Sequence, residues 1–213
     1  YLRNHLKPET SILCVVKAFG YGSNPIQIGK FLEKNNINYL AVAYTNEGIN
    51  LRKSGIKLPI LILHPQFDDF DDIINYKLEP NIYSFRILDS FLQKNTIHPF
   101  HIKFNTGLNR LGFGINDIDK LHKLLPSDSN IKFIFSHLGA SEDLTEKPFT
   151  INQINLFCNI SKKMELKFGK RFKKHLLNTS GILNYSEYQF DMVRSGIGIY
   201  GYGNCKKFKN NFK

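Results

Sequence analysis

Short apolar runs alternate along this chain with longer segments in which apolar and polar residues are mixed. The runs are rich in β-branched and aromatic residues, which is typical of strands. Eight of them can be distinguished, at residues 12–16, 39–43, 59–63, 81–83, 100–104, 132–136, 175–177 and within 192–200. Because most of these runs are apolar throughout rather than alternating, we expect strands buried on both faces, as in a parallel sheet.

The segments between the runs carry the signals of helices. Asn24 followed by Pro25 marks the start of a helix that extends to residue 32, and Ser54-Gly55 ends a helix over residues 45–53. Apolar side chains recur every four residues from 156 to 168, which predicts a long helix over residues 151–168. Further helices are predicted over residues 67–76, 85–94 and 116–125, with a brief one near 185–188.

Eight strands that alternate with helices predict an α/β fold, namely a (β/α)8 TIM barrel with parallel strands. A doubly wound open sheet is the alternative, but no G-x-G-x-x-G sequence follows the first strand. We predict one barrel domain over residues 1–203. Residues 204–213 are polar and basic without strand alternation, and we expect them to be the truncated start of a further domain.

Composition narrows the classes of partner. The net charge of +11 is compatible with nucleic-acid binding, but the lysines are scattered and no nucleic-acid-binding motif accompanies them. No apolar run approaches the roughly 20 residues that span a bilayer, and we expect no signal peptide because no apolar segment follows the first residues. The spacing of Cys14, Cys158 and Cys205 fits neither a metal nor a redox site, which favours the cytoplasm. We therefore expect no nucleic-acid, membrane or metal partner.

Polar side chains follow several of the predicted strands, at the end of a barrel where active sites lie. A lysine in a desolvated site can form a Schiff base, whereas one that reaches solvent has no such role. A histidine there is more often a hydrogen-bonded core residue than a functional one. The candidates are Lys17, Tyr21, Lys103, Arg110, His137, His175, Thr179, Arg194 and Gly196.

The segment V-V-K-A-F-G-Y-G-S-N at residues 15–24 resembles the pyridoxal-phosphate lysine motif of alanine racemases, V-V-K-A-N-A-Y-G-H-G. The resemblance implies that Lys17 forms the Schiff base with pyridoxal 5'-phosphate and that Tyr21 binds its phosphate. Phe19-Gly20 and Ser23-Asn24 depart from the family's pattern.

The segment K-F-N-T-G-L-N-R-L-G-F at residues 103–113 is similar to K-V-D-T-G-M-N-R-L-G-F of the same family. In that family the lysine is often carbamylated and holds the arginine, which bonds the cofactor's phenolic oxygen and the substrate carboxylate. The resemblance assigns these roles to Lys103 and Arg110, and a planar guanidinium suits a carboxylate. Asn105 replaces the usual aspartate, which leaves the local hydrogen bonding open.

Two further segments, S-H-L at 136–138 and H-L-L-N-T-S at 175–180, resemble family segments that line the cofactor pocket. The resemblance places His137 in that pocket and His175 near the pyridine ring and its arginine. It also places the Thr179 hydroxyl on the phosphate, where the family usually has serine.

The segment D-M-V-R-S-G-I-G-I-Y-G at residues 191–201 resembles D-M-V-R-P-G-I-A-L-Y-G, with Ser195 in place of proline. The backbone N–H groups of Gly196 and Ile197 are expected to bind phosphate. By the same resemblance Arg194 lies beside the pyridine nitrogen. Because arginine does not give up its proton, that nitrogen stays unprotonated and the ring is a weaker electron sink, which suits racemisation.

Together these motifs imply pyridoxal-phosphate-dependent racemisation of L-alanine to D-alanine, which supplies peptidoglycan precursors, by a homodimer. Lys17, Arg110 and His137 are the expected catalytic residues. The family's second base is a tyrosine of a C-terminal domain that reaches the partner subunit's site, and Tyr185, Tyr200 and Tyr202 match no such position. We therefore expect this chain alone to bind cofactor weakly and to racemise poorly or not at all.

Two other functions stay open from the sequence. A non-catalytic pyridoxal-phosphate-binding homeostasis protein of the same barrel fold has a similar length, but its G-E-N-x-x-Q-E and H-x-I-G-x-L-Q-x-N-K signatures are absent. A basic nucleic-acid or scaffold module is the third, with only the net charge behind it.

Overall fold

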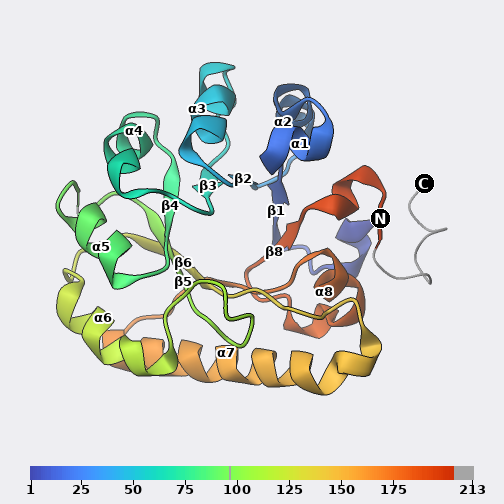
Figure 1. Ribbon diagram of the computed structural model, residues 1–213. Helices are drawn as coiled ribbons and strands as arrows, with labels where there is room; N and C mark the ends of the chain where they lie inside the picture. The colour runs from blue at the N-terminus through green and yellow to red at the C-terminus, as the bar shows by residue number, and fades with distance from the viewer. Residues whose placement is uncertain (96, 204–213) are drawn as a thin grey trace.

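Eight parallel strands close into a barrel in the computed structural model, which describes residues 1–95 and 97–203 (Figure 1). Each strand pairs with the next along the chain, and β8 pairs with β1 through Ser11–Met192 and its neighbours. The strands are β1 (Ser11–Val15), β2 (Tyr39–Val42), β3 (Ile60–Ile62), β4 (Glu79–Ile82), β5 (Phe100–Lys103), β6 (Ile131–Phe135), β7 (Lys174–His175) and β8 (Met192–Ser195). The predicted TIM barrel is confirmed.

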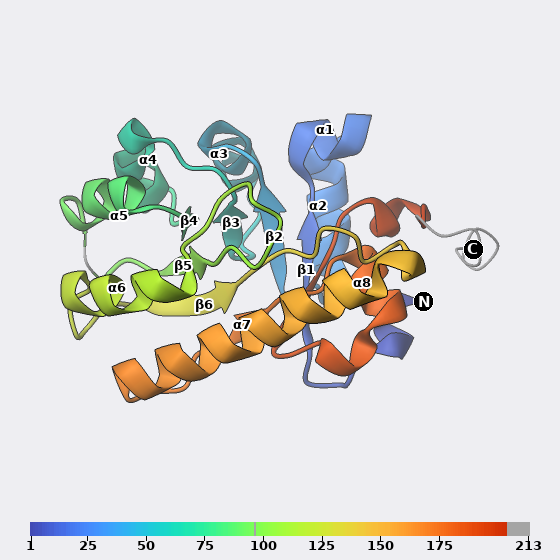
Figure 2. The same cartoon turned by 60° about the horizontal axis from the view of Figure 1, so that its bottom comes forward.

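Helices surround the barrel on its outer side (Figures 1 and 2). They are α1 (Lys17–Gly22), α2 (Pro25–Lys34), α3 (Thr45–Lys53), α4 (Phe70–Asn75), α5 (Phe85–Leu92), α6 (Ile118–Leu124), α7 (Lys147–Phe168) and α8 (Thr179–Asn184). The Asn24 side chain caps α2 as predicted, since its Oδ1 accepts from the backbone N–H groups of Ile26 and Gln27. In the part of the chain that is described, no helix is both long and apolar enough to cross a bilayer.

The strands are buried on both faces, as their apolar sequences predicted. Leu13 and Val15 of β1 belong to a cluster inside the barrel. Ile12, Cys14 and Val16 point outwards into a second cluster that also contains the helix side chains. The two layers follow from the alternation of side chains along a strand.

Part of the barrel interior is polar. Strands β1, β2, β3 and β6 and Met192 of β8 contribute an apolar cluster, whereas β4, β5, β7 and the rest of β8 place buried polar groups in the interior. These groups include Glu79, His101, His175 and Arg194, all less than 10% exposed. Buried polar groups of this kind require hydrogen-bond partners, and Arg194 contributes to them near the carboxyl end of β8.

Three helical segments differ from the sequence-based expectation. Helix α7 begins at Lys147 rather than 151, because Pro148 fits the first turn of a helix. Helix α8 was not predicted, and the helix expected near 185–188 is a 3-10 turn over Ser186–Tyr188 that follows it. The predicted tail at 204–213 lies outside the described residues.

The segment after β1 is a left-handed turn, although it carries the label α1. Ala18, Phe19, Gly20 and Tyr21 all have φ between 52° and 60° and ψ between 37° and 58°. Only one of the four is glycine, and for the others this conformation is unfavourable. The turn separates Lys17 from Tyr21, so its geometry decides where both side chains lie.

Candidate active site

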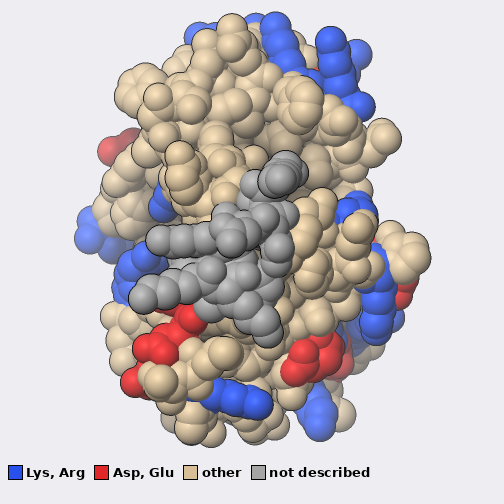
Figure 3. Space-filling model, turned by 90° about the vertical axis from the view of Figure 1, so that its right-hand side faces the viewer, with Lys and Arg blue, Asp and Glu red and all other residues tan. Residues whose placement is uncertain are grey.

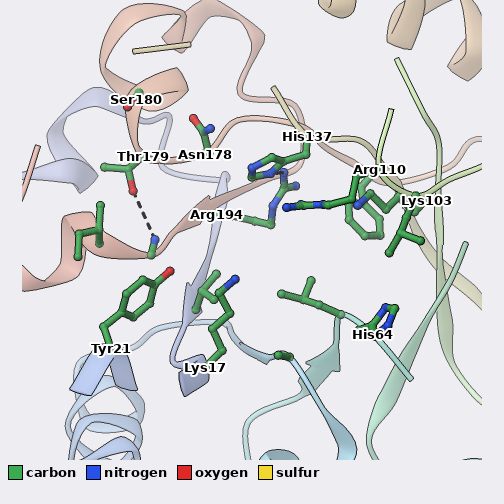
Figure 4. Close-up of a pocket in the computed structure, with 17 residues that line it drawn as sticks. Lys17, Tyr21, His64, Lys103, Arg110, His137, Asn178, Thr179, Ser180 and Arg194 are labelled. Carbon is green, nitrogen blue, oxygen red and sulfur yellow. Dashed lines mark hydrogen bonds between the residues drawn. The ribbon is translucent and has the colours of Figure 1, made fainter. Parts of the chain in front are cut away.

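A cavity of about 570 Å³ opens at the carboxyl ends of the strands (Figure 4). All the site residues predicted from sequence line it except His175, which lies buried beneath Arg194. The lining consists of Val15, Lys17, Tyr21, Ala43, Leu63, His64, Lys103, Arg110, Leu111, Phe135, His137, Asn178, Thr179, Ser180, Arg194, Gly196 and Ile197.

The cavity wall is strongly cationic. Its charged side chains are Lys17, Lys103, Arg110 and Arg194, and no aspartate or glutamate is among the described residues that line it. Burial, together with the neighbouring charges of Arg110 and Arg194, lowers the pKa of Lys103 to about 8. Burial also lowers the pKa of Arg194, to about 9. Cations gathered without counter-charges form a site for an anionic ligand.

Tyr21, Thr179 and Gly196 meet at one end of the cavity (Figure 4). The Gly196 N–H donates to Thr179 Oγ1 at 3.3 Å. A Cβ atom on Gly196 would collide with the Tyr21 hydroxyl, so glycine is needed for this close approach. Two hydroxyls and the backbone of β8 therefore converge at a place where a phosphate could be bound.

Arg110 is carried by the loop that follows β5. Phe113 N donates to Lys103 O, and Asn105 N donates to Phe113 O, both at 2.9 Å, so the loop closes back onto its strand. Asn105 Oδ1 accepts from the backbone N–H groups of Gly107 and Asn109, as an aspartate would. Its Nδ2 donates to Asn109 Oδ1 at 2.9 Å. The oxygen and the nitrogen of the Asn105 side chain are thus both hydrogen-bonded within the loop.

Arg194 is fixed by neighbours from two strands, β6 and β7, and the residues that follow them. Its Nη2 donates to the backbone oxygens of Ser136 and Leu176, at 2.7 and 2.8 Å, and lies 3.1 Å from His137 Nδ1. Its Nη1 lies 2.5 Å from His175 Nδ1. Because burial and the adjacent Arg194 hold the pKa of His137 well below its usual value, this imidazole is neutral, and its Nδ1 can share one of the two Nη2 hydrogens with a backbone oxygen. The guanidinium therefore has a single orientation against the cavity.

A hydrogen-bonded chain continues from Arg194 into the barrel. His175 Nε2 lies 3.3 Å from His101 Nδ1, and His101 Nε2 lies 2.8 Å from Glu79 Oε2. Burial and Arg194 hold the pKa of His175 well below its usual value, so its ring is neutral. Since arginine can only donate, the donors point from Arg194 through both histidines to the Glu79 carboxylate. Sequence reasoning placed His175 near this arginine but missed His101 and Glu79.

Other lining residues were also missed. His64 follows β3 and stacks on Tyr83 with ring centroids 5.3 Å apart, and its place after a strand was a usable signal. Asn178 and Ser180 flank Thr179 in a segment that was read only for its threonine. The apolar members Leu63, Leu111 and Phe135 carry no chemical signal in sequence.

The tyrosines considered for a second base do not line the cavity. The hydroxyls of Tyr185 and Tyr200 are buried without a hydrogen-bond partner among the described residues, and Tyr202 is 65% exposed.

On the face shown in Figure 3, Lys and Arg side chains lie in several separate places with acidic side chains among them.

The comparisons with known proteins agree in pointing to one family. The family model described as "Alanine racemase, N-terminal domain" matches residues 1–204. Alanine racemase of Rickettsia canadensis is 37% identical over 202 residues, which are 91% of this chain and 55% of the relative. Alanine racemase of Thermodesulfovibrio yellowstonii is 34% identical over 209 residues, covering 95% and 55%. The chain thus spans about half the length of these curated relatives.

Solved structures show the same likeness. Alanine racemase of Clostridium difficile 630 in complex with cycloserine superposes with a TM-score of 0.89 at 29% identity, covering 99% of this chain and 60% of that one. The alanine racemase of Bartonella henselae with covalently bound pyridoxal phosphate gives a TM-score of 0.85 at 26% identity, covering 95% and 59%.

Proposed function

Because the chain belongs to the family of alanine racemase N-terminal domains, we propose that it is the cofactor-binding barrel of a pyridoxal-phosphate-dependent alanine racemase. The observation that carries the proposal is a cavity with a lysine just after β1 and three further cations, but no carboxylate among the described residues that line it. Such a wall matches a ligand with a phosphate at one end and a substrate carboxylate at the other.

The residues present fit the cofactor. Tyr21, Thr179 and the N–H groups of Gly196 and Ile197 would hold the phosphate at their end of the cavity. Lys17 Nζ would link covalently to the aldehyde carbon, with loss of water. When bound, pyridoxal phosphate supplies an electron sink for the charge left by removal of the α-proton of alanine.

The other side chains bind, orient and move a proton. Arg110 would bond the substrate carboxylate and the phenolic oxygen of the cofactor, with Lys103 beside it. Arg194 would donate to the pyridine nitrogen and keep it unprotonated, because its own hydrogen bonds fix it in place. Once displaced from the aldehyde carbon by substrate, Lys17 Nζ would take the α-proton from one face. His137 would pack close to the ring as a neutral imidazole, as the direction of its pKa shift supports.

The proposal includes the biological setting implied by the family. We propose that the complete protein acts as a homodimer in the cytoplasm and supplies D-alanine for peptidoglycan. The names of the relatives support the reaction, and their greater length leaves room for the parts that a full active site needs.

Borohydride reduction tests the central assignment. The chain is mixed with pyridoxal phosphate, reduced, digested and mapped by mass spectrometry. We expect the label on Lys17 in the native chain and its loss in Lys17→Ala, with Lys103→Ala as the matched control that keeps Lys17. A label on another lysine would refute Lys17 as the point of attachment, and no retained label would show that the cavity does not take this cofactor.

A further inference from the structure

Lys17 leaves the barrel wall through backbone that is unfavourable for its sequence. The residues that follow it form the left-handed turn described above, with Ala18 at φ 52° and Phe19 at φ 55°. Phe19 is 79% exposed, so packing of its side chain does little to hold the turn. Within the turn, Gly20 N donates to Val16 O at 3.1 Å. Something outside the turn must therefore add to its stability.

Glu47 makes that external contact. Its Oε1 accepts from Ala18 N at 2.7 Å, across 29 positions of sequence. Its Oε2 accepts from Ala43 N at 2.7 Å and from Tyr44 N at 3.0 Å. One carboxylate thus joins the backbone after β1 to the backbone after β2. Hydrogen bonds to an ionised acceptor are the strong ones, which suits a segment that must be held against its own preference.

Helix α3, which carries Glu47, is packed tightly against the barrel. The next residue, Gly48, is buried, and a Cβ atom on it would come within 2.8 Å of Ile62 Cδ1 on β3 and 3.1 Å of Leu78 Cδ1. Leu51, one turn further along the helix, is 1% exposed. Because α3 docks this closely on the barrel, the carboxylate stays in register with the strand ends.

Capping of α3 explains only part of this arrangement. A glutamate at the third position of a helix commonly accepts from the backbone N–H at the helix start, and the Tyr44 bond is of that kind. The Ala18 bond is not, since it reaches the segment between Lys17 and Tyr21 from another part of the chain. Glu47 Oε1 therefore bonds the segment that carries the site residues and plays no part in capping α3.

We propose that Glu47 is a positioning residue, which acts through the Ala18 N–H to hold the left-handed turn and so to present Lys17 and Tyr21 to the cavity. The part of this proposal that concerns the cofactor rests on the proposed function. The part that concerns the turn does not, because it can be measured on the chain without cofactor.

Glu47→Gln is the test, with Glu33→Gln as the matched control. The glutamine keeps the length but puts an NH2 group against one set of N–H donors. Glu33 Oε1 also bridges two backbone N–H groups, those of Lys57 at 2.8 Å and Leu58 at 3.1 Å, but neither residue lines the cavity. Both variants lose the charge of the acceptor, so an effect of charge alone appears in both, whereas only Glu47→Gln must give up one set of N–H donors because Glu33 bonds through a single oxygen.

Two readouts are compared. In Glu47→Gln we expect amide hydrogen exchange at Ala18, followed by NMR, to be about tenfold faster than in the native chain, and the apparent affinity for pyridoxal phosphate to fall about tenfold. Glu33→Gln should change neither. Equal exchange and equal affinity in the two variants would overturn the proposal.

The outcomes separate this proposal from the function itself. If the native chain takes up no pyridoxal phosphate, the proposed function fails, while faster exchange at Ala18 in Glu47→Gln still supports the positioning role. If Glu47→Gln does not fold, Glu47→Asp replaces it. The shorter carboxylate keeps the charge at the start of α3 but cannot reach Ala18 N and the N–H groups of Ala43 and Tyr44 together. Unchanged exchange at Ala18 in that variant would equally overturn the proposal.

Discussion

Lys103 shows what the charge imbalance of the cavity does to one side chain. It is 6% exposed, its neighbours include Arg110 and Arg194, and its ammonium lies 6.0 Å from the centre of the Phe135 ring. Its pKa of about 8 means that the neutral amine is accessible near physiological pH. A neutral amine can take up CO2 and release a proton to give a carbamate, the modification that the family resemblance suggests.

This lowered pKa predicts a pH dependence of stability. Between pH 8 and the ordinary lysine value of 10.5, the unfolded chain holds a proton that the folded chain lacks. The free energy of unfolding should therefore rise with pH across this window, by about 3 kcal/mol in all from Lys103, with the burial penalty fully present below pH 8. Denaturant unfolding in CO2-free buffer measures it, and Lys103→Met removes the rise. If the native chain and the variant keep a constant difference, the amine does not titrate as described. Added bicarbonate should flatten the native curve, since a carbamate is anionic.

Glu79 is the buried acceptor at the end of the chain that starts at Arg194. His101 Nε2 lies 2.8 Å from its carboxylate, and Glu79 together with burial raises the pKa of Tyr39. Glu79→Gln puts an NH2 group where only acceptors fit, and should lower the free energy of unfolding by about 2 kcal/mol. Asp71→Asn is the control: its partner Lys94 and Asp71 itself are 44% and 66% exposed, so the change should stay within about 0.5 kcal/mol. Equal effects from the two substitutions would mean that the buried chain contributes no more than a surface pair.

At the scale of elements, the left-handed turn gives a substitution with an unusual sign. Phe19 is 79% exposed at φ 55°, so Phe19→Gly removes strain and little packing. We expect the free energy of unfolding to rise by about 1 kcal/mol. Phe31→Gly is the matched control, because Phe31 is 66% exposed within the right-handed helix α2, and there glycine should lower it by about 1 kcal/mol. Chemical denaturation of the native chain and the two variants measures these free energies. A lower free energy of unfolding in Phe19→Gly would show that the Phe19 side chain stabilises the fold by more than its left-handed backbone destabilises it.

Which elements the sequence could reveal depended on how local their signals were. Strand β1 and helix α3 have local signatures, namely an apolar run and a Ser54-Gly55 stop, and their predicted positions hold. Helix α8 has none, because its T-S-G-I-L-N sequence is short and starts inside a segment that matched a site motif. The left-handed turn is set by contacts with a distant carboxylate, which no local pattern reports.

Site residues divide in the same way. Lys17, Arg110 and Arg194 were recognisable because their motifs are specific and lie at strand ends. Glu47, Glu79 and His101 were missed because their importance lies in pairings between elements, such as the contact of His101 on β5 with Glu79 on β4. A lone buried histidine or glutamate has too many ordinary explanations in sequence.

At the scale of the whole molecule, the described cavity offers an amine base at Lys17, and its one described tyrosine, Tyr21, is assigned to the phosphate. In D2O, the chain loaded with pyridoxal phosphate should therefore exchange the α-hydrogen of one alanine enantiomer with retention, roughly 10²-fold or more faster than it converts that enantiomer into the other. Chiral chromatography with mass spectrometry measures both rates, with Lys17→Ala as the inactive control. Equal rates would reveal a second base within the barrel, and absence of both would favour the non-catalytic carrier.

Strand β7 is the shortest of the barrel, with two residues, and Arg194 adds side-chain hydrogen bonds to its backbone pairing. The register of β7 with β8 is His175–Met192, and Arg194 N donates to Leu177 O at 2.9 Å just beyond it. The guanidinium of Arg194 also bonds Ser136 O and Leu176 O past the ends of β6 and β7, so this side chain reinforces the closure of the wall. A molecule that bonds this guanidinium from the cavity side binds only the closed wall, and its affinity is thermodynamically linked to closure. At a ligand concentration 100 times its Kd, local opening at β7 becomes about 2.7 kcal/mol harder. A ligand bound in the cavity therefore also stabilises the closed barrel at β7.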